Sequence, residues 1–191
     1  RFLMRERSEK WSGPIVDNHF HLNRSGRFLE AAKDFKNAGG TGLVLVHCPD
    51  FKNPPTTKLG HRESYQDTIN MAQSVRSELG LEVRVVLGPH PAAFAHQFIN
   101  WVSSEGDKGS QKAIENYRSS IDEAVRFYHE GQAHAIGEVG RPHWPVSDEI
   151  WNRSNILLQE TMELAARENI PLQLHVEGES DLTYGELAQM A

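Results

Sequence analysis

The amino-acid sequence predicts an α/β fold built from repeated βα units, and two patterns along the chain support this. Short apolar runs typical of strands alternate with longer segments whose apolar residues follow helical spacing. Glycine and proline residues stand between these segments, where turns are expected. Strands that alternate with helices are typical of parallel βαβ units, so we expect one parallel sheet.

The first half of the chain holds two expected strands and two expected helices. A strand at residues 15–21 follows a Gly-Pro turn signal, and apolar residues at helical spacing over 28–38 stop at a pair of glycines. The run 41–48 is continuously apolar, as in strands buried on both faces. A polar loop at 49–60 leads to a second helical stripe over 65–79, which ends at a glycine.

The next βα unit begins with a strand at residues 82–87, followed by the turn sequence Gly-Pro-His-Pro. A short helical turn is expected at 92–98 and a charged, glycine-containing loop at 103–109. Apolar residues at helical spacing predict a helix over 114–128.

Two further units complete the chain. A strand at 133–139 precedes Ser147, which is expected to cap a helix that runs to about Asn169, because acidic residues follow it in the first turn. The run 172–176 is the last expected strand, and a helix begins at about residue 181.

Size and composition are those of one globular domain, with 191 residues of which 38% are hydrophobic and 24% charged. We divide the chain into a charged N-terminal extension at residues 1–14 and a single domain at 15–191. No apolar run reaches the length of about 18 residues that suggests a membrane-spanning helix, so no membrane association is expected.

The single cysteine and the acidic net charge bear on location and partners. Cys48 has no intramolecular disulfide partner and fits a reducing compartment, so we expect a cytoplasmic location. We interpret it as a small buried side chain. The net charge of −6 gives no electrostatic footprint for nucleic acid, although a bound metal would supply local positive charge.

Residues suited to metal or acid–base chemistry stand at the ends of the expected strands. In chain order they are His19 with His21, His47 with Cys48, His90, Glu138 and His175. Functional residues of a (β/α)8 barrel lie at the C-terminal ends of its strands. The pattern therefore favours a TIM-barrel-like (β/α)8 fold over a doubly wound sheet. His61, His96, His129 and His134 fall elsewhere and are interpreted as structural or surface residues.

The first strand carries a His-x-His pattern. Because strand side chains alternate between faces, Asp17, His19 and His21 are expected on one face, where the two imidazoles could converge on a metal ion. Asp17 could orient one of these ligands. The alternative is a strand with two hydrogen-bonded, partly buried histidines.

Glu138, His175 and their neighbours are the next candidates. A carboxylate at the end of an apolar strand is costly to bury unless it is paired or binds metal, and it can bridge two ions. Gln173 shares a face with His175 and could support it. His90 is interpreted as a ligand or as a substrate contact, and a salt-bridged Glu138 remains the structural alternative.

Four short motifs carry a resemblance to a known family. They are Asp17-Asn18-His19-Phe20-His21-Leu22, Gly88-Pro89-His90-Pro91, Gly137-Glu138-Val139-Gly140 and Leu174-His175. From residue 15 onward the chain resembles the TatD-like metal-dependent hydrolases of the amidohydrolase superfamily. The run at residues 137–146 is most similar to an archaeal branch of that group.

The resemblance implies a two-metal hydrolase in which Glu138 is catalytic. His19 and His21 would bind one divalent ion, Glu138 would bridge, and His175 would bind the other, with Zn, Mn, Mg and Fe all open. The implied reaction is attack of a metal-activated water on a phosphodiester bond, in nucleic acid or a small molecule.

The sequence departs from the family at two points. The family's Leu-Asp is replaced by Arg141-Pro142, so Arg141 and His143 could instead hold an anionic group such as phosphate, or form an exposed loop pair. The family barrel has eight strands and we expect five here. The remaining histidine ligand and the water-activating aspartate would lie beyond Ala191, so this chain is expected to be the N-terminal part of a barrel and inactive alone.

Two alternative functions stay open. One is hydrolysis of an amide, ester or lactone by the same metal-activated water. The other is a non-catalytic metal-binding or interaction module.

Overall fold

The computed structural model describes residues 11–178 and 180–191, so most of the expected N-terminal extension lies outside the described residues. Within them, strands and helices alternate. The strands are β1 (Val16–Phe20), β2 (Gly42–Val46), β3 (Glu82–Leu87), β4 (Ala135–Gly140) and β5 (Leu172–His175). The helices are α1 (Leu29–Asn37), α2 (Lys58–Leu79), α3 (Pro91–Glu105), α4 (Asp107–His129), α5 (Asp148–Glu168) and α6 (Asp181–Met190).

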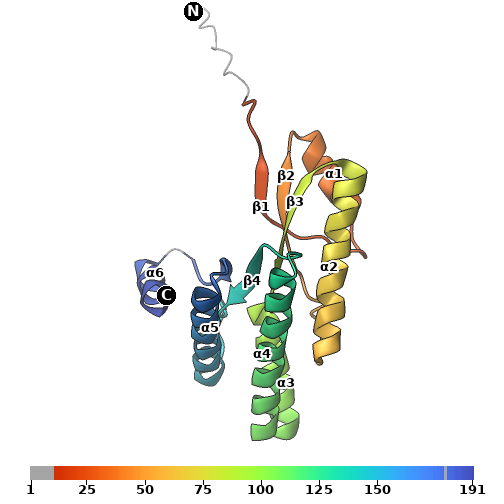
Figure 1. Ribbon diagram of the computed structural model, residues 1–191. Helices are drawn as coiled ribbons and strands as arrows, with labels where there is room; N and C mark the ends of the chain where they lie inside the picture. The colour runs from red at the N-terminus through yellow and green to blue at the C-terminus, as the bar shows by residue number, and fades with distance from the viewer. Residues whose placement is uncertain (1–10, 179) are drawn as a thin grey trace, which may run out of the picture.

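The five strands form one parallel sheet in the order β1-β2-β3-β4-β5 (Figure 1). A doubly wound sheet would reverse its strand order at a switch point, so the sequential order is that of a barrel. The sheet is curled so far that its two edge strands come into contact: Gln173 Nε2 on β5 donates to the backbone oxygen of Asn18 on β1, 2.9 Å away. The prediction of an incomplete TIM-barrel-like fold is confirmed as a curled half-barrel.

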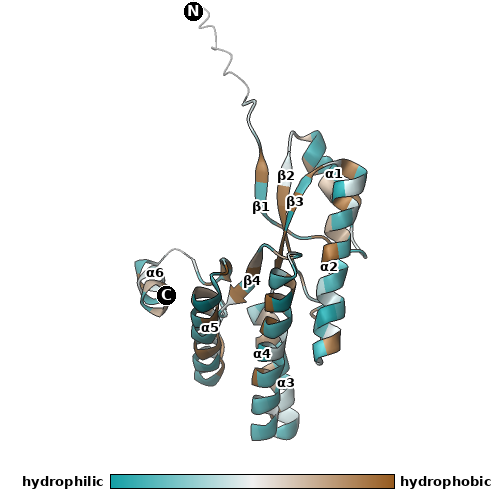
Figure 2. Cartoon of the chain, viewed as in Figure 1, coloured by the Kyte–Doolittle hydropathy of each residue, from teal (hydrophilic) through white to brown (hydrophobic). Residues whose placement is uncertain are grey.

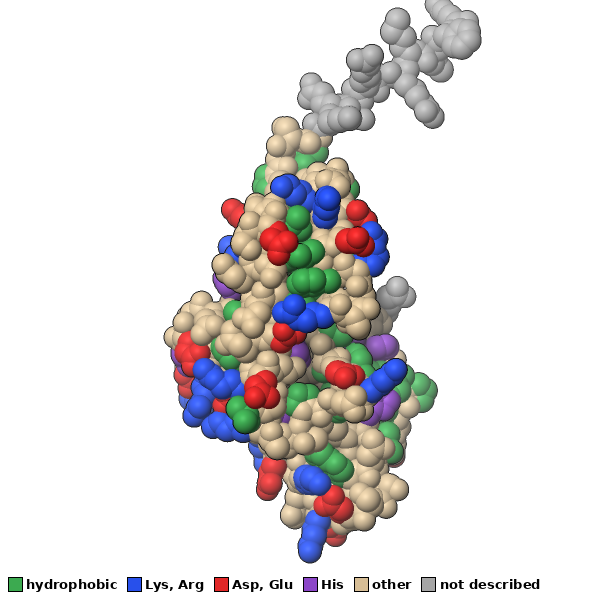
Figure 3. Space-filling view, turned by 90° about the vertical axis from the view of Figure 1, so that its right-hand side faces the viewer, with side chains coloured by type: hydrophobic (Ala, Val, Ile, Leu, Met, Phe, Trp, Pro, Cys, Tyr) green, Lys and Arg blue, Asp and Glu red, His purple; other side chains and the backbone are tan. Residues whose placement is uncertain are grey.

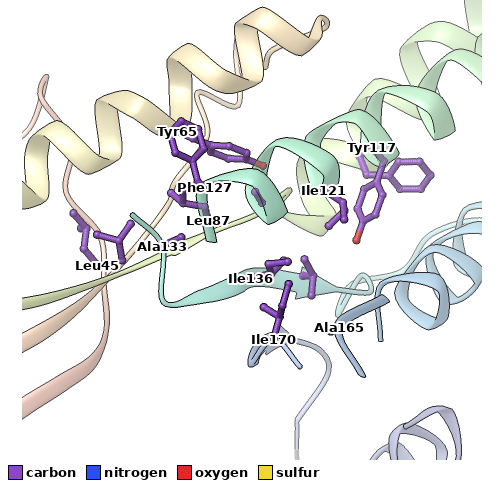
Figure 4. Packing of buried hydrophobic residues seen from close by; sticks show 14 of the residues in the cluster. Leu45, Tyr65, Leu87, Tyr117, Ile121, Phe127, Ala133, Ile136, Ala165 and Ile170 are labelled. Atoms are coloured by element: carbon purple, nitrogen blue, oxygen red, sulfur yellow. The ribbon is translucent and has the colours of Figure 1, made fainter. Parts of the chain in front are cut away.

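The helices pack on the outer side of the sheet (Figure 1). Helix α2 contacts β2 and β3, and α4 and α5 both contact β4. Their apolar stripes face the strands, while the outer surfaces are hydrophilic (Figure 2). Leu45, Leu87 and Ile136 from three neighbouring strands meet Tyr65 and Phe127 from the helices in one buried cluster (Figure 4). None of the helices in the described part of the chain is both long and apolar enough to cross a membrane.

The expected short turn at 92–98 and loop at 103–109 are wrong, because both belong to helices. His90 caps α3 and Pro91 opens it, which starts a helix that continues to Glu105. Gly106, at a φ of 59°, lets the chain turn directly into α4. A Cβ on Gly109 would lie 2.0 Å from the backbone oxygen of Trp101, so only glycine allows the two helices this close approach.

The helices α2 and α4 begin earlier than expected, at Lys58 and Asp107, whereas two other expected helix ends are confirmed. Ser147 caps α5 by accepting a hydrogen bond from the backbone nitrogen of Ile150 at 3.4 Å. Gly80 ends α2 in the left-handed conformation. The candidate residues lie at or just after the C-terminal ends of parallel strands, so they meet at one edge of the sheet.

Candidate metal centre

The carboxylate of Glu138 is the centre of a cluster of histidines at the C-terminal ends of the strands. Its side chain is 5% exposed. His175 Nδ1 lies 2.7 Å and His19 Nε2 3.5 Å from its Oε2. His21 Nε2 and His90 Nε2 lie 3.5 Å and 3.4 Å from its Oε1. Four imidazoles from three parts of the chain therefore surround one buried carboxylate.

The same atoms form two groups that could each hold a metal ion. His19, His21 and Glu138 make one group, and His90, Glu138 and His175 make the other, with the ligand atoms of each group within 4.8 Å of one another. Imidazole and carboxylate donors suit zinc, manganese and iron. Glu138 belongs to both groups, so one carboxylate is shared by the two candidate metal positions.

A hydrogen bond to the backbone holds the His21 ring. Its Nδ1 lies 2.9 Å from the backbone oxygen of Val46 at the end of β2. A carbonyl oxygen only accepts, so Nδ1 carries the proton and Nε2 presents its lone pair toward His19 Nε2, 3.0 Å away. Asp17, expected to orient a ligand, accepts from the backbone nitrogen of His19 at 2.9 Å and thereby shapes the strand rather than an imidazole.

His90 has the opposite tautomer. As the N-cap of α3 it accepts a hydrogen bond at Nδ1 from the backbone nitrogen of Ala92, 3.0 Å away. Burial, only partly offset by the nearby Glu138 carboxylate, lowers the pKa of His90 to about 4, so the ring is neutral near pH 7. A neutral ring that accepts at Nδ1 carries its proton on Nε2, which faces Glu138. His90 is therefore presented to the cluster as an N–H donor.

His143 also reaches the cluster. Its Nδ1 lies 2.8 Å from His175 Nε2, and the two ring centres are 4.8 Å apart. The other nitrogen of His175 faces Glu138, so a continuous chain of hydrogen bonds runs from the buried carboxylate to the exposed His143 ring.

The ionisation of Glu138 suits a metal ligand. Burial alone would raise the pKa of this carboxyl, but the hydrogen bond from His175 and the charges of the surrounding imidazoles outweigh it and lower the pKa below its usual value. The carboxylate is thus ionised at neutral pH, as metal binding requires.

Glycines bring the site strands together. A Cβ on Gly140 would lie 1.8 Å from the backbone oxygen of His175, and one on Gly137 would lie 2.6 Å from that of Gln173. A Cβ on Gly88 would lie 2.9 Å from the backbone nitrogen of Gly137. The glycines on either side of Glu138 therefore have a steric function, which is close packing of β4 between its neighbours.

Arg141 is occupied by protein groups. Its side chain is 2% exposed. Its Nε donates to Glu177 Oε2 and its Nη1 to Asn155 Oδ1, each at 2.9 Å, and Nη2 donates to Glu177 and Glu186. The guanidinium also lies over the ring of Trp151. This geometry gives Arg141 a structural role and leaves His143 as the more accessible of the two residues expected to meet an anion.

Gln173 does not contact the cluster through any hydrogen bond in the described residues. Its side chain bridges β5 to β1 instead, through Asn18. Cys48 is exposed, so the expectation of a buried side chain is wrong. Its strand, β2, ends before it, and the chain turns outward into the loop that leads to α2.

Sequence reasoning missed the residues that hold the cluster in place. Phe51 packs edge-on against His90, with ring centres 5.2 Å apart. Glu177 and Asn155 fix Arg141. Only Glu177 could have been found from the sequence, because it stands two residues after His175, where the last strand ends. Phe51 lies in a polar loop with no periodic pattern, and its contact depends on tertiary structure.

The chain is similar to known proteins over most of its length. A model of the family described as TatD related DNase matches residues 16–190. Uncharacterized protein MJ1127 of Methanocaldococcus jannaschii is 32% identical over 180 residues, which cover 93% of this chain and 60% of that protein. The chain therefore spans about 60% of the length of this curated relative.

Proposed function

Because the chain belongs to the TatD related DNase family, we propose that it carries the metal centre of a metal-dependent hydrolase that cleaves phosphodiester bonds. The observation that carries the proposal is the buried Glu138 carboxylate, which lies within 3.5 Å of imidazole nitrogens of His19, His21, His90 and His175. In this proposal His19 and His21 bind one ion, His175 binds a second, and Glu138 bridges them.

The ions, Glu138 and His90 have different roles in the proposed reaction. When bound, two divalent ions would lower the pKa of the attacking water and offset charge on the leaving oxygen. Glu138 would hold both ions through its carboxylate, because it belongs to both candidate groups. His90 donates its Nε2–H to a phosphoryl oxygen of the substrate, since this proton points into the cluster.

Nucleic acid is the proposed substrate, although the chain has a net charge of −6. Acidic and basic side chains are interspersed over one face of the molecule (Figure 3). On this surface, recognition of phosphate depends on the bound ions and on N–H donors such as His90, rather than on a broad basic patch. We also propose a cytoplasmic location, because the single cysteine fits a reducing compartment.

The proposal is tested by metal analysis combined with hydrolysis assays. A longer protein that contains this chain together with the rest of the barrel, and its variant with both His19→Ala and His21→Ala, are loaded with Zn or Mn and assayed on single-stranded DNA, a generic phosphodiester and an ester. We expect the variant to lose one ion per chain while its thermal unfolding in the absence of metal stays close to wild type.

Three results would redirect the proposal. Full metal content in the double variant would remove these histidines from the centre. Turnover of esters without turnover of diesters would favour the amide, ester or lactone alternative. A wild-type protein that takes up no metal would favour the non-catalytic module.

We further propose that the 191-residue chain alone lacks turnover. Within the described residues, the groups able to hold metal contain one carboxylate, that of Glu138, which leaves no second carboxylate to take the proton of the attacking water. Metal-dependent turnover by the purified 191-residue chain as a monomer would contradict this.

A further inference from the structure

His21 and His175 lie on opposite sides of Glu138. They differ in the group that contacts the ring nitrogen on the side away from this carboxylate. The Nδ1 of His21 meets the backbone oxygen of Val46, an acceptor that no side-chain substitution removes. The Nε2 of His175 meets the Nδ1 of His143, a side-chain atom that can either donate or accept. The protonation pattern of His175 is therefore open to control by a side chain.

The contact between His143 and His175 is built by the fold. Arg141 and Pro142, just before His143, are buried, and the backbone nitrogen of Arg141 donates to the backbone oxygen of His175 at 3.0 Å. Trp144, just after it, packs against the hydrophobic core and lies edge-on to the His143 ring, with ring centres 5.1 Å apart. An exposed histidine between anchored neighbours is held toward its partner at little further entropic cost.

Without an ion, the Glu138 carboxylate determines the tautomer of His175. A carboxylate only accepts hydrogen bonds, so the contact of 2.7 Å requires the proton of His175 on Nδ1. Nε2 of the neutral ring is then an acceptor, and His143 donates to it from Nδ1.

An ion held by His175 Nδ1 beside Glu138 would reverse this arrangement. Nδ1 of His175 must then present its lone pair to the ion, so the proton of the neutral ring moves to Nε2. That proton needs an acceptor. If the exposed His143 ring exchanges its Nδ1 proton with solvent for one on Nε2, its Nδ1, 2.8 Å away, becomes that acceptor. Histidines that bind metal commonly donate their other N–H to such a partner, which orients the ring and raises its basicity.

We propose that His143 is a positioning residue for the second ion: by changing from donor to acceptor it stabilises the metal-binding tautomer of His175. The inference rests on the proposed function, because it assumes that His175 binds an ion. It assigns to His143 a role in metal affinity rather than in contact with the phosphate.

The test combines titration with zinc and nitrogen NMR of the histidine rings in the 191-residue chain. His143→Ala removes the acceptor, His143→Asn places a carbonyl oxygen close to the position of Nδ1, and His96→Ala removes an exposed histidine from α3 as a matched control. We expect His143→Ala to weaken the second zinc equivalent by about 10- to 100-fold and to leave the first unchanged. His143→Asn should restore most of that loss, and His96→Ala should match wild type.

The NMR spectrum supplies a readout that a purely structural role would not change. In the wild-type chain the His175 proton should move from Nδ1 to Nε2 when zinc is added. Equal zinc affinities for wild type and His143→Ala, or a proton that stays on Nδ1 in the zinc-loaded chain, would overturn the inference. Failure of the wild-type chain to bind a second zinc at all would instead overturn the two-ion proposal.

Discussion

The two sides of the Glu138 carboxylate are built by different means. On the β1 side, His21 is oriented by the main chain of β2, so the position of its ligand nitrogen follows directly from strand pairing. On the β5 side, His175 depends on the His143 side chain, and the loop that carries His143 depends on the bonds of Arg141. The β1 side is therefore expected to tolerate distant substitutions that disrupt the β5 side.

The largest effect should come from Glu138→Gln, because this residue serves both sides at once. The amide cannot supply the negative charge that offsets two ions. Metal affinity at both positions should therefore fall by more than roughly 100-fold, which is the upper cost of losing a residue that only hydrogen-bonds a metal ligand. Calorimetric titration with zinc measures both equivalents. Retention of either equivalent at wild-type affinity would show that the two sides do not share the carboxylate.

Gly140→Ala should damage the β5 side through packing alone. The added Cβ would lie 1.8 Å from the backbone oxygen of His175, so β4 and β5 must separate. We expect a loss of at least about 1–3 kcal/mol in the free energy of unfolding, measured by urea denaturation. Gly178→Ala is the control, since its Cβ meets nothing within 4 Å. Equal stability of the two variants would mean that the strands are not in tight contact here.

His90→Asn should separate substrate binding from metal binding. Asparagine is a good N-cap and keeps the hydrogen bond at the start of α3, but its shorter side chain withdraws the N–H donor from the cluster. We expect the binding of inorganic phosphate to the metal-loaded protein, measured by calorimetric titration, to weaken about 10- to 100-fold, because a hydrogen bond to a charged group is lost. Loss of a bound ion in this variant would make His90 a ligand instead.

The smallest effect should be a dependence of stability on pH. The folded pKa of His90 is about 4, below the value of 6.5 for a free histidine, because the ring is buried. Between these values the unfolded chain binds more protons than the folded chain, so this contribution to stability is full above about pH 6.5 and is lost as the pH falls toward 4. Urea denaturation of metal-free protein should show a shallower decline over this range in His90→Asn than in wild type.

The sequence predicted the order of the strands and the residues at their ends. Apolar runs mark β2 to β5 because strands of a parallel sheet are buried on both faces, and residues after such runs must lie at one edge. His19, His21, His90, Glu138 and His175 could therefore be chosen from sequence position alone. The full length of α3 and the early start of α4 were missed because a charged segment containing Gly106 and Gly109 has the composition of a loop. Only the packing of the two helices turns it into a tight junction.

What the sequence by itself determined was the βα repeat, the half-barrel and the set of candidate ligands, because all three follow from local periodicity and strand ends. Tertiary structure alone decided which nitrogen each histidine presents and which residues support it. The pairing of β1 with β2 and of β4 with β5 shifts register next to His19 and Glu138. Such shifts re-aim side chains in a way that a period of two does not predict. His143 reaches His175 and Arg141 turns inward because of partners that are distant in the sequence, and local patterns carry no information about those contacts.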